Sequence, residues 1–226
     1  MGRLAVVLGS NATGPHGAEI ARAAETSGAI VVQRHSGAAG AYVLPHAIDH
    51  AANLRDLVEQ GCDRVLAIAS VGSLNRELEV GSFVCPDDFI AFGVGLTSRD
   101  DAGAHMTPGF DPGWRQVVLT TWKEAGVALR DGGVYWQTTG PRFETPAEIR
   151  LMAAHADLVG MTIGGECTIA GELGLSYATV CVVDNLANGL GKEPLGIEEI
   201  EAVRNANAIE LRDALAAVVP RLKEPA

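Results

Sequence analysis

The sequence predicts an α/β fold of three layers, in which helices flank a central, mostly buried mixed sheet. Short apolar runs alternate with helical patterns along the chain, which is typical of such folds. A chain of 226 residues is long enough to bury a sizeable core, and 47% hydrophobic with 20% charged residues indicates a folded protein. No repeat or low-complexity segment divides the chain, so we expect a single domain over residues 1–226.

The predicted strands are short apolar runs rich in β-branched residues and bounded by turn residues. They cover residues 4–8, 29–33, 64–69, 82–85, 133–138 and 177–183, and a shorter run lies at 157–160. Runs without polar alternation indicate strands that are buried on both faces. The sheet should therefore lie inside the molecule, between two layers of helices.

Helical patterns occupy the segments between these runs, at 17–27, 46–60, 113–125, 146–155, 166–173 and 198–218. The helix start at 146 is the best signalled, because Thr145 can cap it, Pro146 suits its first position and Glu148 completes a capping box. Residues 97–114 are rich in Gly, Pro and Asp and have no periodicity, so we expect a long loop there.

Charge and cysteine content exclude several classes of function. A formal net charge of −11, from 17 basic and 28 acidic residues, makes a basic face for nucleic acid improbable. No apolar run reaches the roughly 18 residues that span a bilayer, and the N-terminal residues 1–14 suit a first strand better than a signal peptide. The four cysteines form no CxxC pair, so we expect buried thiols, no metal site and a cytoplasmic protein.

Polar residues follow the predicted strands, where ligands of open α/β sheets gather. One set carries donors that suit a small oxyanion, and comprises Ser10, Arg34, His35, Ser70 and Thr162. A second set suits a planar heterocycle with polar edges, and comprises Phe143, Glu144 and Asn185. Met161 would be an apolar contact between the two sets.

Each of these residues also has an ordinary structural interpretation. Ser10 suits a turn, His35 a structural hydrogen bond, Phe143 the core and Asn185 a strand end. Their joint placement after several strands is what favours a binding site. The segment 9–14 has the glycine spacing of a P-loop, but Pro15 and His16 follow it where that loop needs Lys and Ser or Thr.

Taken together, these motifs resemble the family of trimeric purine nucleoside phosphorylases and methylthioadenosine phosphorylases. The similarity runs in order through GS ending at 10, RH at 34–35, ASVGSL at 69–74, GPRFET at 140–145, VGMT at 159–162 and VVDNLANG at 182–189. It implies a phosphorylase-like fold and cleavage of a purine nucleoside by inorganic phosphate, which is a co-substrate. It further implies no metal or organic cofactor, and a homotrimer or dimer of trimers.

The resemblance also implies roles for single residues. Ser10, Arg34, His35, Ser70 and Thr162 would hold phosphate, Phe143, Glu144 and Asn185 would hold the base, and Met161 would lie under the ribose. We expect His35, Glu144 and Asn185 to be catalytic, and Arg142 to brace its loop. The sequence departs from the family at Gly164-Gly165, where Val-Pro is usual, at Asp184, where Thr is typical, and in a shorter segment between 34 and 53.

Two positions decide which nucleoside we expect. Glu144 as an acceptor and Asn185 as a donor match a 6-oxopurine, whereas Asp184 facing the base would suit adenine and a methylthioadenosine phosphorylase. In phosphorylases of this kind that act on ordinary nucleosides, the resemblance implies a histidine that reaches the 5′-hydroxyl. By spacing, Ile197 takes that position here, so it would favour a 5′-methylthio group; it also suits the first core position of a helix. A hydrolytic nucleosidase and a non-catalytic purine nucleoside binder stay open as alternatives.

Overall fold

The computed structural model describes residues 2–25, 28–191 and 196–223, with only the backbone described at Ala39, Ile197, Glu199 and Lys223. The strands are β1 (Arg3–Leu8), β2 (Ile30–Gln33), β3 (Cys62–Ser73), β4 (Phe83–Cys85), β5 (Asp88–Ile90), β6 (Arg130–Asp131), β7 (Val134–Gln137), β8 (Leu158–Gly160) and β9 (Ser176–Leu186). The helices are α1 (Gly17–Glu25), α2 (His50–Glu59), α3 (Pro112–Glu124), α4 (Pro146–Met152), α5 (Ile163–Glu172) and α6 (Ile197–Val218).

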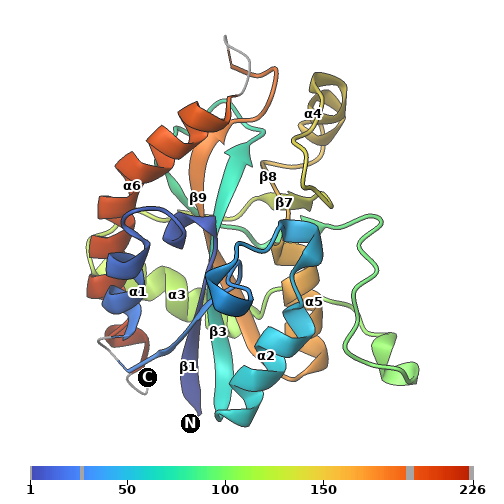
Figure 1. The fold of residues 1–226 in the computed structure, drawn as a ribbon, viewed down its shortest axis with the longest axis vertical. Helices are drawn as coiled ribbons and strands as arrows, with labels where there is room; N and C mark the ends of the chain where they lie inside the picture. Colours follow the sequence, from blue (N-terminus) through green and yellow to red (C-terminus); the bar gives the residue numbers. More distant parts are fainter. Residues whose placement is uncertain (1, 26–27, 192–195, 224–226) are drawn as a thin grey trace.

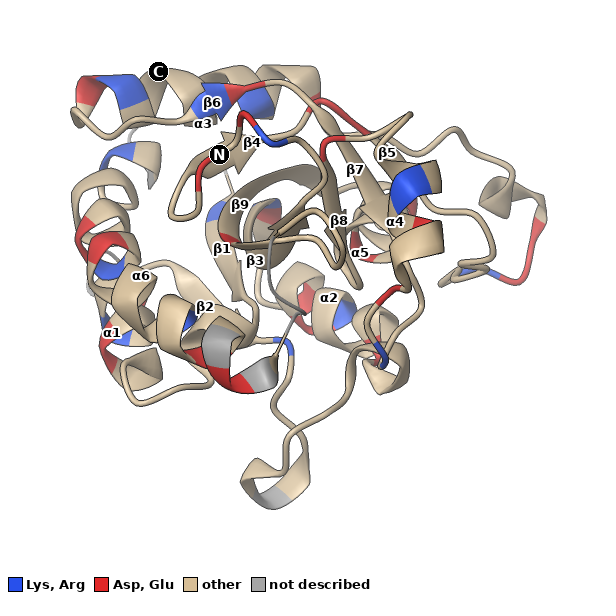
Figure 2. Ribbon diagram, turned by 90° about the horizontal axis from the view of Figure 1, so that it is seen from above, with Lys and Arg blue, Asp and Glu red and all other residues tan. Residues whose placement is uncertain are grey.

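The strands of the described residues belong to one sheet, which is mixed, as predicted. It has nine strands, two more than the sequence indicates. The sheet runs β5-β7-β8-β3-β9-β4-β6, and β1 joins β3 to β2. Strands β1, β2, β3 and β9 are mutually parallel, whereas β8 meets the last residues of β3 in antiparallel orientation and pairs in parallel with β7. Seen end-on, the sheet curls around itself (Figure 2).

Helices cover both faces of the sheet, which confirms the three-layer prediction (Figure 1). Successive residues of β1 show the division, because neighbouring side chains of a strand point to opposite faces. Leu4, Val6 and Leu8 enter a core shared with α1, α3 and α6. Ala5 and Val7 enter a second core shared with α2 and α5. The polar ends of the strands are thereby held between two packed helical layers.

The two central strands are longer than the sequence indicates. β3 continues to Ser73 and β9 to Leu186, and they stay paired through an irregularity between Val71 and Gly72. Ser70 and Asn185 therefore lie within strands instead of following them. The short strands β5 and β6 were not predicted, because two or three residues are too few to show a period.

Helix boundaries differ from prediction where local chemistry intervenes. α2 begins at His50, not at 46, because residues 45–47 form a 3-10 turn and the Asp49 side chain caps the helix at Ala52 N. α5 begins at Ile163, three residues before the predicted start, because Gly164 and Gly165 are poor helix formers and masked the pattern.

The capping box of α4 is present as predicted, with Thr145 and Glu148 each accepting from the other's backbone N–H. The helix ends at Met152, not at 155. The predicted long loop protrudes from the molecule up to the start of α3 (Figure 1). Its first residues are fastened by Glu172, which accepts hydrogen bonds from Thr97 and Ser98.

The remaining composition-based predictions concern cysteines, charge and membranes. The four cysteines are buried free thiols, as predicted. Acidic and basic residues are interspersed along the outer helices (Figure 2). Within the described ranges, no helix is both long and apolar enough to cross a membrane.

Candidate functional site

A cavity of about 440 Å³ lies where the parallel strands end. Nine of the eleven predicted site residues line it: Ser10, Arg34, His35, Ser70, Phe143, Glu144, Met161, Thr162 and Asn185. β1, β2, β3 and β9 reach it from one direction, and β7 and β8 reach it from the other because β8 is antiparallel to β3. Its volume falls in the range of small-molecule sites.

One end of the cavity is lined by the predicted oxyanion set. Ser10 opens a 3-10 turn directly after β1, and Thr162 is the N-terminal cap residue of α5, where its hydroxyl makes no capping hydrogen bond. Gly9 is required beside them, because a Cβ there would lie 2.8 Å from both Arg34 Nη1 and the Ile68 carbonyl oxygen. Only glycine at this position lets the backbone approach the guanidinium so closely.

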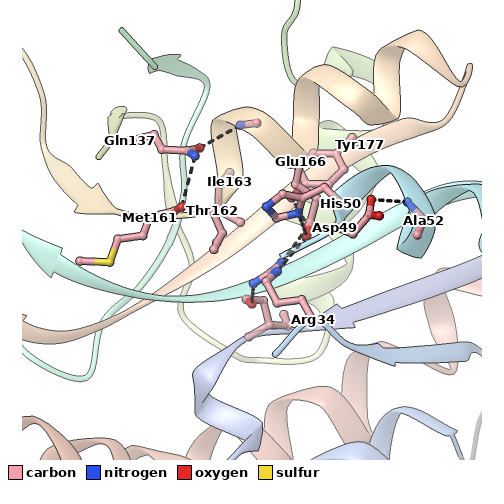
Figure 3. A network of polar contacts seen from close by, with 12 residues as sticks. Arg34, Asp49, His50, Ala52, Gln137, Met161, Thr162, Ile163, Glu166 and Tyr177 are labelled. Carbon is pink, nitrogen blue, oxygen red and sulfur yellow. Dashed lines mark hydrogen bonds and ion pairs between the residues drawn. The ribbon is translucent and has the colours of Figure 1, made fainter. Parts of the chain in front are cut away.

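Arg34 is held by a buried network around Glu166 (Figure 3). Its Nε and Nη2 donate to the two oxygens of Glu166 at 2.8 and 2.7 Å, and its Nη1 donates to the Ile68 carbonyl at 3.0 Å. His50 Nδ1 and the Tyr177 hydroxyl also contact the Glu166 carboxylate, at 3.3 and 2.7 Å. Sequence analysis did not assign Glu166, His50 or Tyr177 a role, because their contacts depend on distant segments.

Glu166 and Arg34 both stay charged in this network. Burial opposes ionisation of Glu166, but the Arg34 guanidinium and the hydrogen bonds from His50 and Arg34 more than offset it, so the pKa of Glu166 lies well below its usual range. Burial alone would lower the pKa of Arg34, and the Glu166 carboxylate raises it above its ordinary value. The Arg34 guanidinium is therefore fixed in place, and its charge is already balanced by the Glu166 carboxylate.

His35 is a neutral imidazole in this setting. Its ring stacks on Tyr42, with centroids 5.0 Å apart, and its Nδ1 lies 2.9 Å from the Val43 carbonyl oxygen. A carbonyl oxygen accepts only, so Nδ1 carries the proton and Nε2 keeps a lone pair. Burial lowers the pKa of His35 to about 4. At neutral pH this residue offers an acceptor to a protonated oxygen, where sequence analysis expected a donor.

The other end of the cavity carries the predicted base-binding set. Glu144 is buried, and its Oε1 accepts from the Thr138 hydroxyl at 2.7 Å, which leaves Oε2 for a ligand. Phe143 is 42% exposed at the cavity mouth. Arg142 braces this loop as expected, because its guanidinium donates twice to Glu148, at 2.9 and 2.8 Å.

Of the neighbours Asp184 and Asn185, it is Asn185 that lines the cavity. Asp184 is fully buried behind the wall, so its prediction as a substrate-binding residue is wrong. Asp184 is the extra residue where the register of β9 against β3 shifts, and its carboxylate accepts hydrogen bonds from the Ser70 hydroxyl and from Asn207 Nδ2. The Ile197 side chain, predicted at the 5′ end, lies outside the described residues.

The unusual Gly164-Gly165 pair makes room for the segment 89–96. A Cβ on Gly164 would lie 2.9 Å from Phe89 Cδ2, and one on Gly165 would lie 2.7 Å from Leu96 Cδ1. Gln137 accepts from the Gly165 N–H at 2.8 Å and donates to the Met161 carbonyl at 3.2 Å (Figure 3). These contacts fix the backbone of Met161 beneath the cavity.

Several cavity-lining residues carry no signal in the sequence. They are Thr13, Tyr42, Leu44, Pro45, Asn188, Ile200, Glu201 and Arg204. Arg204 is the most notable, because it brings a second guanidinium to the wall from α6. It belongs to no motif and reaches the site only through packing of α6 against the sheet.

Comparison with known proteins shows the family. The model of the phosphorylase superfamily matches residues 6–220. A protein of Archaeoglobus fulgidus named "Probable 6-oxopurine nucleoside phosphorylase" is 44% identical over 167 residues, which cover 74% of this chain and 69% of that protein. A "Probable S-methyl-5′-thioinosine phosphorylase" of Methanothermobacter thermautotrophicus is 36% identical over 182 residues, covering 79% of this chain and 64% of that protein.

A solved structure shows the same fold. The methylthioadenosine phosphorylase from Schistosoma mansoni, in complex with adenine, superposes with a TM-score of 0.79 at 19% identity. The match covers 96% of this chain and 90% of that one. Together with the family match over nearly the whole chain, this means that the chain belongs to the phosphorylase superfamily.

Proposed function

We propose that this protein cleaves the N-glycosidic bond of a 6-oxopurine nucleoside with inorganic phosphate, giving the free base and a ribose 1-phosphate or its 5-deoxy-5-methylthio form. The observation that carries the proposal is one cavity lined by two chemically different sets of side chains. Ser10, Arg34 and Thr162 belong to the first set, and Phe143, Glu144 and Asn185 belong to the second. The names of the similar proteins support the same reaction.

The proposed mechanism follows from where charge develops. As the bond to the base breaks, the sugar becomes cationic and the purine becomes negative. Phosphate bound at the Arg34 end stabilises the sugar cation and then captures C1′. Hydrogen bonds at the Glu144 and Asn185 end strengthen as the base gains charge, and such interactions accelerate the step. We propose no metal or organic cofactor, and phosphate serves as co-substrate.

The choice of base follows from Glu144 and Asn185. The unpaired Oε2 of Glu144 can accept from N1–H of a 6-oxopurine, and the Asn185 amide can donate to the purine. Adenine would place its N1 acceptor against the Glu144 carboxylate, and opposed acceptors in a buried site discriminate strongly. The burial of Asp184 outside the cavity wall removes the residue on which an adenine preference would have depended.

For the sugar, we propose an apolar 5′ pocket that accepts a 5′-methylthio group. The support is the place of Ile197 in the sequence and the similarity to a protein named for methylthioinosine. Leu44 and Pro45 line the cavity and add apolar surface.

The assay that tests the function combines a nucleoside panel with phosphate. Inosine, guanosine, adenosine and their 5′-methylthio forms are incubated with and without phosphate, and free base and sugar phosphate are measured. Phosphate-dependent release of hypoxanthine or guanine is the expected result. Release without phosphate would indicate a nucleosidase instead, and binding without release would indicate a nucleoside sensor.

We also propose that the protein acts in purine salvage in the cytoplasm as a homotrimer or a dimer of trimers. The support for the assembly alone is the exposed apolar side chains of Tyr42, Leu44, Phe92, Leu96 and Phe143. Apolar surface of this kind marks interaction sites in soluble proteins. Light scattering coupled to size exclusion measures the assembly, and a monomeric mass would contradict it.

A further inference from the structure

Arg204 is a cation in the cavity wall. No group in the described part of the chain accepts a hydrogen bond from it. It lies in the third turn of α6 and lines the cavity. Its side chain is 20% exposed, and its Nε is shut off from solvent without a hydrogen-bond partner. The contact it makes within the described residues is an approach of Nε to 3.8 Å from Asp184 Oδ2, which is too long for a hydrogen bond.

This arrangement differs from that of the other arginines near the site. Arg34 uses Nε, Nη1 and Nη2 on protein acceptors, and Arg142 forms a double hydrogen bond with Glu148. Buried donors without acceptors are costly to leave unpaired. A guanidinium with unused donors in a cavity wall is therefore suited to an anionic ligand, which can accept two hydrogen bonds from it.

Contacts through Asp184 place Arg204 at the oxyanion end of the cavity. The same Asp184 oxygen that Arg204 approaches accepts from the Ser70 hydroxyl, and Asn11 Nδ2 lies 3.5 Å from it. Asn11 belongs to the turn that begins at Ser10. Arg204 is thus one side chain away from Ser70 of the predicted phosphate set, and from Asn11, the neighbour of Ser10.

Two further contacts agree with this position. Gly14, just after that turn, packs against the helix at Asn205, since a Cβ on Gly14 would lie 3.0 Å from Asn205 Oδ1. Burial raises the pKa of Tyr42, and the nearby charge of Arg204 opposes that rise. Tyr42 is the residue whose ring stacks on His35. Arg204 therefore faces the Ser10 and His35 side of the cavity.

The residues at this end offer little unbalanced positive charge to an anionic ligand. Arg34 is matched by Glu166, and His35 is neutral at pH 7 because burial lowers its pKa to about 4. Glu201 also lines the cavity, one turn before Arg204, and adds negative charge. The Nε of Arg204 is shut off from solvent beside Asp184, so the Nη edge is the part available to a ligand.

We propose that Arg204 binds the phosphate co-substrate from α6 and supplies positive charge in addition to that of the Glu166-paired Arg34. The proposal rests on the proposed phosphorolytic function. It makes α6 part of the phosphate site, and it assigns Asp184 the task of positioning Arg204 and the Ser70 hydroxyl.

The test compares Arg204→Gln and Arg204→Lys with the unmodified protein. Arg212→Gln is the matched control, because Arg212 lies on the same helix two turns further and pairs with Glu19 and Asp213 away from the cavity. Three quantities are measured: KM for phosphate, KM for the nucleoside, and the rise in Tm produced by inorganic phosphate alone. The third measurement needs no catalytic turnover.

We expect Arg204→Gln to raise KM for phosphate at least ten-fold, to leave KM for the nucleoside within two-fold, and to abolish most of the phosphate-induced rise in Tm. Arg204→Lys should recover part of both effects, and Arg212→Gln should behave as the unmodified protein. A phosphate KM and Tm response that stay unchanged in Arg204→Gln would overturn the proposal while leaving phosphorolysis intact. A chain that responds to phosphate through Arg204 but cleaves no nucleoside would overturn the proposed function alone, and a chain indifferent to phosphate would overturn both.

Discussion

Arg34 and Glu166 lie 132 positions apart in the chain and form two hydrogen bonds, of 2.8 and 2.7 Å, in a fully enclosed setting. The two side chains are 1% and 2% exposed. Arg34 follows β2 and Glu166 belongs to α5, so the pair ties the edge of the sheet to the helix layer behind the cavity. The guanidinium is therefore oriented before any ligand arrives, which reduces the ordering cost of binding.

Glu166→Gln should lower the free energy of unfolding by about 3–5 kcal/mol, because it leaves the buried Arg34 charge without a counter-charge. Urea unfolding at pH 7 measures the loss. Glu172→Gln on the same helix is the control, since Glu172 accepts hydrogen bonds from Thr97 and Ser98 at the start of the protruding loop and is not part of the buried network. A loss below about 1 kcal/mol would show that solvent or a neighbour compensates the charge.

His35 should make stability depend on pH. Its pKa is lowered by burial from 6.5 to about 4, so between these values the unfolded chain binds a proton that the folded chain does not. Stability then rises with pH over this window and falls as pH drops through it, by up to about 3 kcal/mol. His35→Gln should flatten the unfolding free energy between pH 4 and 6.5, whereas the exposed His155→Gln should not.

Asn185→Asp should shift base preference toward adenine. A carboxylate cannot donate to O6 of a 6-oxopurine but can accept from the N6 amino group of adenine. The ratio of kcat/KM for inosine over adenosine measures the change, and we expect it to fall at least ten-fold. A clear preference of the unmodified protein for adenosine would refute the assignment of Glu144 and Asn185 to a 6-oxopurine.

The 5′ end of the sugar gives a separate test of Ile197. With an apolar residue there, 5′-methylthioinosine should be used at least as well as inosine, and Ile197→His should shift kcat/KM toward inosine. If the unmodified protein favours inosine ten-fold or more, which is ~1.4 kcal/mol, the apolar pocket is wrong. The enzyme would then be an ordinary nucleoside phosphorylase.

Gly164→Val should destabilise the fold by about 1–3 kcal/mol, as overpacking does. The added Cβ would lie 2.9 Å from Phe89 Cδ2 and 3.1 Å from Ala91 Cβ. Gly171→Ala on the same helix is the control, because its new Cβ meets the flexible end of Met106. Thermal unfolding compares the two variants. Equal Tm values would show that segment 89–96 moves to accommodate the added side chain.

The sequence was sufficient to predict a mixed sheet without the short strands β5 and β6, both helix layers and nine residues of the cavity wall. Most of those residues follow apolar strands or lie near their ends, and parallel strands bring their ends to one edge. Asp184 and Asn185 were harder to separate, because the pairing of β9 with β3 shifts by one residue at Asp184 itself, and this shift changes the direction of each side chain. Only the register of β3 and β9 shows that Asp184 turns inward.

Two other features needed the fold itself. Arg204 lies in the middle of a long helix without a motif, and its place in the cavity depends on how α6 packs on the sheet. The neutral state of His35 depends on burial and on the Val43 carbonyl, which local sequence does not reveal. Long-range packing decided both.

The carboxylate of Glu166 is shared by side chains from three separate parts of the chain, Arg34, His50 and Tyr177. The energetic effects of substitutions among residues in one such network are not additive, so the cost of losing two of them is not the sum of the single losses. A double variant with apolar side chains of similar volume at 34 and 166 could fold as well as the unmodified protein and still lack phosphate affinity. In related proteins that have lost the activity, we therefore expect positions 34 and 166 to be substituted together, and not one without the other.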